Sequence, residues 1–171
     1  MSAKIDLHLH LDGSLDLPWA YKTALKRGTI PSEWTFEQYY DHVYNHDFAT
    51  REMRMTKFDI PISIMQTKED LYASVYNLIE TLNEKGMVYA EIRFAPQQHC
   101  LLGLSQREVV EAVLEGMHQA NLDFPNVKTG IINCMMHKGD SAFVNMEQNM
   151  ETIEVTKEFY GKGVVALDLA G

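Results

Sequence analysis

Residues 4–10 read KIDLHLH, and the alternation of apolar and polar side chains in this stretch decides the fold class. Side chains of a β-strand point to opposite faces in turn, so the three apolar residues share one face while Asp6, His8 and His10 share the other. The Asp12-Gly13 pair that follows is typical of a turn. The sequence therefore predicts a strand that presents two imidazoles from one face near its carboxyl end.

The same pattern analysis predicts three further strands, separated by helices. Short apolar runs with strand-like spacing place them at residues 87–94, 129–136 and 164–169. An order in which strands alternate with helices indicates a parallel sheet with right-handed crossovers. The expected class is α/β, and either an open doubly wound sheet or part of a barrel satisfies this order.

Helices are predicted from apolar stripes, capping residues and terminating glycines: over residues 18–27, after Thr67, after Ser105, and over about 141–160. The last of these carries the apolar residues Met146, Met150 and Ile153. Residues 29–66 hold irregularly spaced aromatic residues, which indicates short helices inserted after the first strand. We expect this excursion to cover one end of the domain.

The length and net charge of the chain limit the classes of function that it can have. The 171 residues, 46% of them hydrophobic, suit one domain with a sizeable core and no internal boundary. With 15 basic and 24 acidic residues the net charge is −9, which argues against binding of nucleic acid or of an anionic membrane surface. The sequence contains no apolar run of membrane-spanning length. Cys100 and Cys134 suggest no disulfide framework, so a soluble, cytoplasmic protein is expected.

His8 and His10 are the leading candidates for chemistry. Neutral imidazole is a good zinc ligand, and ligands bind at the carboxyl ends of the strands in parallel α/β folds. The alternative is a pair of histidines at the rim whose ring nitrogens are satisfied by hydrogen bonds. The position at the end of the first strand, with Asp12 close behind, favours the metal. His99 and His137 follow the second and third strands and are expected to be ordinary loop residues.

Charged residues on the second predicted strand suggest a structural layer. Glu91 and Arg93 share one face, and with Asp6 or Asp168 they predict a buried ionic layer, because buried charges must be paired. Motifs of several enzyme classes are absent from the sequence: GxGxxG, the Walker A loop, GxSxG, HExxH, and the zinc signature of cytidine-type deaminases. Dinucleotide and P-loop nucleotide binding are thereby disfavoured.

Several stretches together resemble the adenosine deaminase family. Residues 5–14, IDLHLHLDGS, are similar to the opening motif of that family, and residues 89–96, YAEIRFAP, to its second strand. Residues 165–171, VALDLAG, resemble its fourth strand, and Leu104-Ser105 with residues 108–110 matches the bacterial pattern. These matches run in order along the chain, which makes the combination far more specific than any one motif.

The resemblance implies a (β/α)₈ barrel of TIM type that binds one zinc ion at the carboxyl ends of its strands. It implies hydrolysis of adenosine or deoxyadenosine to inosine or deoxyinosine and ammonia, by water that zinc activates. His8 and His10 would be zinc ligands, and His10 would also lie against the substrate. Asp12 would hold the ribose 5′-hydroxyl, and the backbone N–H of Gly171 would reach N3 of the purine.

By this resemblance, residues 1–171 correspond to the N-terminal half of the barrel. The remaining zinc ligands and the acid and base groups of the family lie beyond that point, so no catalytic acid or base is assigned to this chain. We expect a complementary C-terminal half-barrel to complete the enzyme, and the 171-residue chain alone to be inactive. The alternatives are a deaminase of adenine, AMP or aminodeoxyfutalosine, and a non-catalytic half-barrel that serves as a binding or assembly module.

Overall fold

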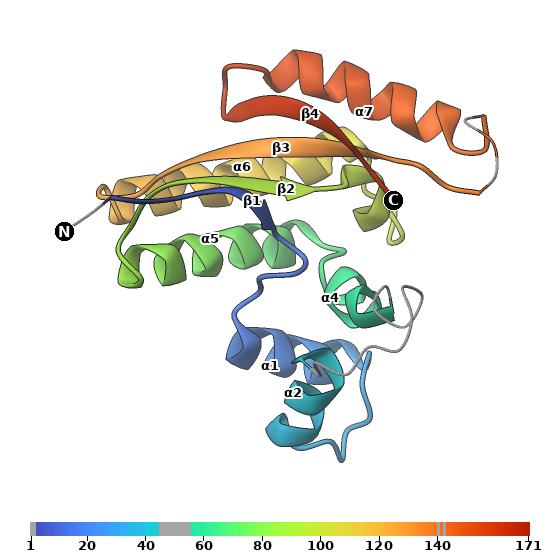
Figure 1. Ribbon diagram of the computed structural model, residues 1–171. Helices are drawn as coiled ribbons and strands as arrows, with labels where there is room; N and C mark the ends of the chain where they lie inside the picture. The colour runs from blue at the N-terminus through green and yellow to red at the C-terminus, as the bar shows by residue number, and fades with distance from the viewer. Residues whose placement is uncertain (1–2, 45–55, 140, 142) are drawn as a thin grey trace.

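The computed structural model describes residues 3–44, 56–139, 141 and 143–171, which build one sheet of four parallel strands (Figure 1). The strands are β1 Lys4–His10, β2 Met87–Phe94, β3 Lys128–Met136 and β4 Val164–Ala170. Their order in the sheet is β1-β2-β3-β4, so each strand pairs with the next one along the sequence. All four predicted strands are confirmed to within one residue at either end.

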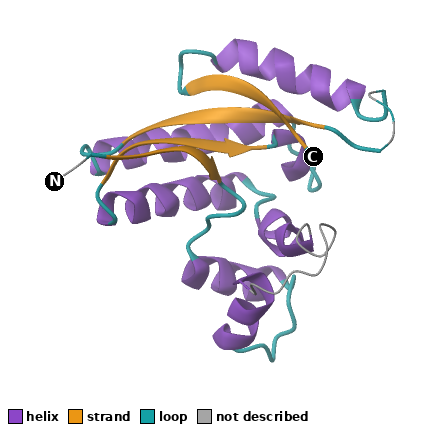
Figure 2. Ribbon diagram, in the orientation of Figure 1, coloured by secondary structure: helices purple, strands orange, loops and turns teal. Residues whose placement is uncertain are grey.

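Three long helices cover one face of this sheet: α5 (Lys68–Glu84), α6 (Gln106–Asp123) and α7 (Met146–Phe159). Helix α5 packs on α6, and α6 on α7, so the three form a single outer layer (Figure 2). An open doubly wound sheet carries helices on both faces, whereas the wall of a β/α barrel carries them on the outer face only. The one-sided layer confirms the half-barrel prediction. No helix among the described residues has the length and apolar character needed to cross a bilayer.

The helical excursion predicted after the first strand is present beside the carboxyl end of β1 (Figure 1). It contains α1 (Leu17–Arg27), α2 (Phe36–Tyr44), the 3₁₀ helix η1 (Thr56–Phe58) and α4 (Asp59–Ile64). The Asp16 carboxylate caps α1 by accepting a hydrogen bond from the Trp19 N–H at 2.8 Å. Gly28, with φ of 68°, ends this helix. Within the predicted range of 29–66, residues 45–55 lie outside the described part of the chain.

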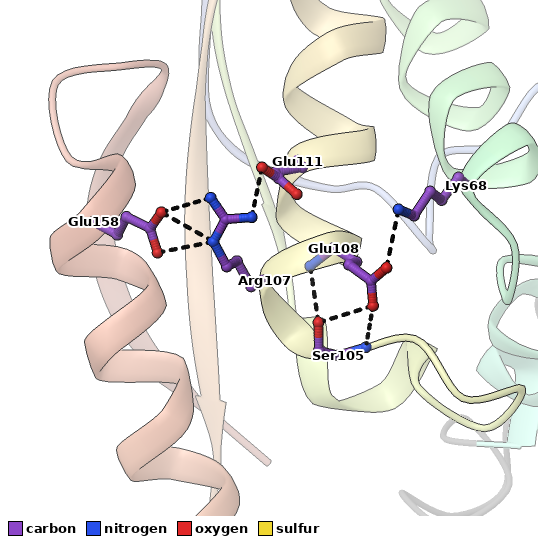
Figure 3. Close-up of polar contacts among 6 residues, drawn as sticks. All are labelled: Lys68, Ser105, Arg107, Glu108, Glu111 and Glu158. Atoms are coloured by element: carbon purple, nitrogen blue, oxygen red, sulfur yellow. Dashed lines mark hydrogen bonds and ion pairs between the residues drawn. The ribbon is translucent and has the colours of Figure 1, made fainter.

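The start of α6 is fixed by the capping box that the sequence predicts (Figure 3). The Ser105 hydroxyl accepts a hydrogen bond from the Glu108 N–H at 3.3 Å, and the Glu108 carboxylate accepts one from the Ser105 N–H at 3.1 Å. The same carboxylate forms an ion pair with Lys68 of α5 at 3.0 Å. On the other side, Arg107 forms an ion pair with Glu158 of α7 at 2.8 Å. The first turn of α6 is thereby linked to both neighbouring helices.

Helix α7 differs from the sequence prediction. It begins at Met146 rather than near residue 141, and its apolar residues Met146 and Met150 are 52% and 50% exposed. The buried residues of this helix are Thr152, Val155 and Thr156. The Thr156 hydroxyl accepts a hydrogen bond from the Asn133 amide of β3 at 3.0 Å. A polar contact orients the helix here, and a purely hydrophobic pattern does not detect it.

Apolar residues of the two edge strands are much less covered than those of β2. Ala90 and Ile92 of β2 are fully buried beneath the helices. Ile5 and Leu7 of β1 are 58% and 54% exposed, and Leu169 of β4 is 58% exposed. In a barrel, the outer ring of helices covers the outward side of every strand. Both edges of the described sheet therefore present apolar surface of the kind that another helical layer covers.

Candidate active site

His8 and His10 lie on the inner face of β1, the face that the helices leave open. Their ring centroids are 5.4 Å apart with planes inclined by 40°, and His10 is in register with Arg93 of β2. Partial burial lowers the pKa of His10, and the nearby charges of His8 and Arg93 lower that pKa further. The imidazole of His10 is therefore neutral at neutral pH, which is the form that binds a metal ion.

A cavity of about 400 Å³ opens beside His10 at the carboxyl ends of the strands. Its walls come from all four strands, the segment that follows β2, and the helical excursion. They include His10, Asp12, Phe58, Cys134 and Gly171. His8 adjoins His10 without lining this cavity. A larger hollow of about 720 Å³ between α1, α2, α4 and α5 shares Asp12 and Phe58, but neither of these two histidines lines it. The smaller cavity is therefore the candidate substrate site, because it combines the predicted site residues.

Asp12 is buried, with an exposed fraction of 7%, and lies between the two cavities. Its Oδ1 atom has no hydrogen-bond partner among the described residues and lies 4.0 Å from Nδ1 of His10. Burial raises the pKa of Asp12 to about 6, while hydrogen bonds from the backbone of Asp12 and Gly13 oppose this rise. Asp12 is thus mostly ionised at pH 7. A buried carboxylate oxygen without a partner can accept a hydrogen bond from a ligand hydroxyl.

Gly171 forms the opposite side of the cavity, immediately after β4. Its φ is +118°, a value that residues with a side chain rarely adopt. The adjoining Ala170 carbonyl accepts a hydrogen bond from the His137 N–H at 2.7 Å, which joins the ends of β3 and β4. The structure thus brings His10, Asp12 and Gly171, the three predicted substrate contacts, around one cavity.

The donor set fits part of a zinc site. His8 and His10 offer two imidazoles of the kind that zinc prefers, whereas a catalytic zinc site usually has three protein ligands. Among the described residues, no group of three or more His, Cys, Asp and Glu side chains is placed to hold a metal ion. Burial raises the pKa of the Cys134 thiol to about 12, and a protonated thiol is a poor ligand. The two histidines could therefore supply only part of such a site.

One histidine prediction is wrong. His99 is not an ordinary loop residue: it is fully buried in the 3₁₀ helix η2 (Pro96–His99), and its Nδ1 lies 3.0 Å from the Met65 carbonyl oxygen. Desolvation lowers the pKa of His99 to about 4, so the ring is neutral and Nδ1 donates this hydrogen bond. His137 is exposed after β3, as expected for a loop residue. His99 connects η2 to the end of the helical excursion and belongs to the core.

Of the predicted buried ionic layer, only one ion pair is present among the described residues, with Asp168 as the acidic partner, and the Asp168 side chain is 39% exposed. The Arg93 guanidinium of β2 forms an ion pair with the Asp168 carboxylate of β4. Asp6 instead accepts a hydrogen bond from the His8 N–H at 2.9 Å, and Glu91 accepts one from the Tyr89 hydroxyl at 3.1 Å. Charge pairing therefore concentrates on one cross-sheet contact.

Sequence analysis did not identify Phe58 and Cys134 as cavity residues. The Phe58 ring centroid lies 6.4 Å from that of His10, although the two residues are far apart in the sequence. Cys134 faces the cavity because it shares the inner face of β3 with Met136, two residues further along. The alternation along β3 could have revealed Cys134. The contribution of Phe58 depends on how the excursion folds back, which no local pattern specifies.

A one-sided parallel β/α sheet with a cavity at the carboxyl ends of its strands defines the wall of a TIM-type barrel. A model of the family described as adenosine deaminase matches residues 3–171. The chain therefore belongs to the adenosine deaminase family, and the sequence resemblance is confirmed.

Curated relatives and solved structures agree with this assignment. The chain is 40% identical to an adenosine deaminase of Haemophilus ducreyi and 36% identical to one of Clostridium perfringens, covering 98% of this chain in each case. It spans only 48% and 49% of those two relatives.

Two solved structures share the fold. They are an adenine deaminase from Arthrobacter aurescens (TM-score 0.77, 18% identity) and a Burkholderia ambifaria amidohydrolase with bound Zn (TM-score 0.75, 17% identity). The chain is covered over 100% and 98% of its length, and it covers 49% and 43% of theirs. Both comparisons place the described sheet as about half of a larger barrel.

Proposed function

We propose that this chain is the N-terminal half of a zinc-dependent barrel that hydrolyses adenosine or deoxyadenosine to inosine or deoxyinosine and ammonia. The observation that carries the proposal is that His10, Asp12 and Gly171 line one cavity at the carboxyl end of the sheet. The 40% identical relative, an adenosine deaminase, supports the same reaction class.

Each residue has a definite task in this proposal. His8 and His10 would hold the zinc ion, which when bound makes water a sufficient nucleophile at neutral pH. Asp12 would accept a hydrogen bond from the 5′-hydroxyl of the ribose through its unpartnered Oδ1. Gly171 would donate its backbone N–H to N3 of the purine, at a place where a side chain would obstruct the ring. We assign no catalytic acid or base to this chain, and we expect those groups in the complementary half.

A complementary half-barrel is also the partner expected from the uncovered edges and inner face of the sheet. Ile5 and Leu7 of β1 and Leu169 of β4 are apolar and largely exposed, and strands at the edge of a sheet leave backbone N–H and C=O groups unpaired. Covering both edges and the inner face would bury a core-like interface, well above the standard ~1,600 Å². The fact that the matched relatives are about twice as long supports this partner.

The experiment joins the chain to the part of the Haemophilus ducreyi adenosine deaminase that it does not match. This assembled barrel should release ammonia from adenosine only when zinc is present, whereas the 171-residue chain alone should release none. The matched control is the same relative divided at the corresponding point and rejoined. If the control is active and the assembled barrel is not, the proposal fails.

The choice of substrate is tested in the same assay. The negative charge of Asp12 would repel the phosphate of AMP, so a nucleoside with a free 5′-hydroxyl is the preferred substrate. Adenine, AMP and aminodeoxyfutalosine are the competing substrates, and faster turnover of any one of them would replace adenosine in the proposal. If the barrel assembles but turns over none of these four compounds, the non-catalytic module is favoured instead. We also expect a cytoplasmic location, where Cys100 and Cys134 stay reduced as free thiols.

A further inference from the structure

We propose that Arg93 is a positioning residue that sets the spacing between the two walls of the candidate active site. The inference rests on the proposed function for its substrate, but its geometric part can be tested without any turnover. It concerns a side chain outside the cavity lining, in the layer of the sheet just beneath it.

Arg93 contacts the strands on both sides of the site. It lies on the inner face of β2, in register with His10 of β1 and with Ile132 of β3. One terminal nitrogen, Nη2, donates to the Leu7 carbonyl oxygen of β1 at 3.0 Å. The other, Nη1, forms the ion pair with Asp168 of β4 and so reaches across β3. A single guanidinium therefore links β1 directly to β4.

The two anchor points precede the site residues by the same number of positions in the sequence. Leu7 precedes His10 by three residues on β1, and Asp168 precedes Gly171 by three residues on β4. His10 and Gly171 lie on opposite sides of the cavity, and Asp12 follows His10 on the same side. A change in the separation of Leu7 and Asp168 therefore changes the width of the cavity that a nucleoside would span.

The energetics indicate that this contact serves more than stability. The Arg93 side chain is 12% exposed, and its Nε is buried without a hydrogen-bond partner among the described residues. An unsatisfied buried donor has a cost, and the Asp168 side chain is 39% exposed, so solvent screens the ion pair and limits its contribution to stability. The more specific consequence of the contact is geometric, because one planar group with two donors links β1 to β4.

The test replaces the pair in the assembled barrel with the double variant Arg93→Met and Asp168→Leu. The midpoint of thermal unfolding should stay within a few degrees of the parent. The kcat/KM for adenosine should fall at least tenfold, mainly through KM, because the two walls bind the substrate before reaction. The dissociation constant of inosine should rise by a similar factor. The matched control is Arg107→Met with Glu158→Leu, an ion pair between helices whose residues do not line the cavity (Figure 3).

A readout without turnover keeps the two proposals separate. Cys134 lies between the paired groups on β3 and is 2% exposed, so looser walls should open it to alkylation. Rates are compared at equal thiolate fraction because, beyond the effect of burial, the Asp168 charge raises the pKa of this thiol and the Arg93 charge lowers it. In a Cys100→Ser background, the alkylation rate of Cys134 should rise at least tenfold in the Arg93→Met and Asp168→Leu variant. An unchanged rate, or a thermal midpoint that falls in step with kcat/KM, would overturn the inference. If the parent barrel releases no ammonia but the alkylation rate rises, the proposed function fails and the positioning role stands.

Discussion

A Cβ atom on Gly171 would lie 2.3 Å from the carbonyl oxygen of His137. That contact is too short for real atoms, and the φ of +118° at Gly171 adds strain for any residue with a side chain. The segments that follow β3 and β4 are therefore packed backbone to backbone at the rim of the cavity. Glycine is required here by both the available space and the backbone conformation.

Gly171→Ala should consequently displace the end of β4. We expect kcat/KM for adenosine in the assembled barrel to fall at least tenfold, and the strained backbone to cost about 1–3 kcal/mol of stability. Gly28→Ala is the control, because Gly28 also has a positive φ but no atom within 4 Å of an added Cβ. That variant should lose stability and keep its activity. If Gly171→Ala is as active as the parent, the close approach has no bearing on the site.

Zinc retention should depend on both candidate ligands. Replacing His8 or His10 by Ala in the assembled barrel should weaken zinc binding at least tenfold, because each change removes a donor from the set. Metal content after dialysis measures the effect. His118→Ala provides the control, since this exposed histidine of α6 is remote from the cavity lining. Full zinc content in both the His8 and His10 variants would remove these residues from the metal site.

Asp12 should contribute to recognition of the ribose and not of the purine base. Asp12→Ala should lower kcat/KM for both adenosine and 5′-deoxyadenosine, but the loss for adenosine should be about tenfold or more larger. The reason is that a hydrogen bond to a charged group contributes about 1.5–3 kcal/mol. Comparison of the two nucleosides with parent and variant gives this ratio. Asp16→Ala, which removes the cap of α1 in the same loop, should affect both nucleosides equally. An equal loss for the Asp12 variant would mean that its carboxylate does not contact the sugar.

His99 should make stability depend on pH. Its pKa is about 4 in the folded chain against about 6.5 when unfolded, so only the unfolded state takes up the proton between these values. Stability is therefore fully present above pH 6.5 and falls as the pH drops toward 4, by as much as about 3 kcal/mol.

The measurement is the thermal midpoint of the assembled barrel between pH 7.5 and pH 4.5. His99→Asn keeps a donor near the position of Nδ1 and cannot titrate, so its midpoint should fall less steeply over this range. Parallel curves for the parent and this variant would contradict the assignment.

The sequence predicts the strands and the main helices of the fold because these elements depend on local patterns of residues. Alternation along residues 4–10 locates β1 and its inner face, and the Ser105 capping box marks the start of α6. Helix α7 shows where this approach fails. Its buried face is set by Thr156 bonding to Asn133, a contact between polar residues 23 positions apart. Hydrophobic periodicity contains no information about such a pair.

The locations of candidate site residues are easiest to predict for residues on or next to strands. His10 is indicated by its place at the end of β1, since the carboxyl ends of parallel strands meet at one edge, whereas Gly171 is indicated only by the family resemblance. Phe58 reaches the cavity through the fold of an irregular excursion, and His99 is buried by packing of η2 against residue 65. Both depend on tertiary contacts between separate segments, so no single stretch of sequence indicates them.

The order of the sheet also bears on how the protein is made. Every strand is hydrogen-bonded only to its neighbours in the sequence, with the intervening helices folded between them. Pairing of β1 with β2 needs no residue beyond Phe94, so it can form while β3 and β4 are still being synthesised. Each later strand then adds to an existing template. The sheet can grow in the direction of translation once β2 has joined β1, a pairing that closes the long connection of residues 11–86.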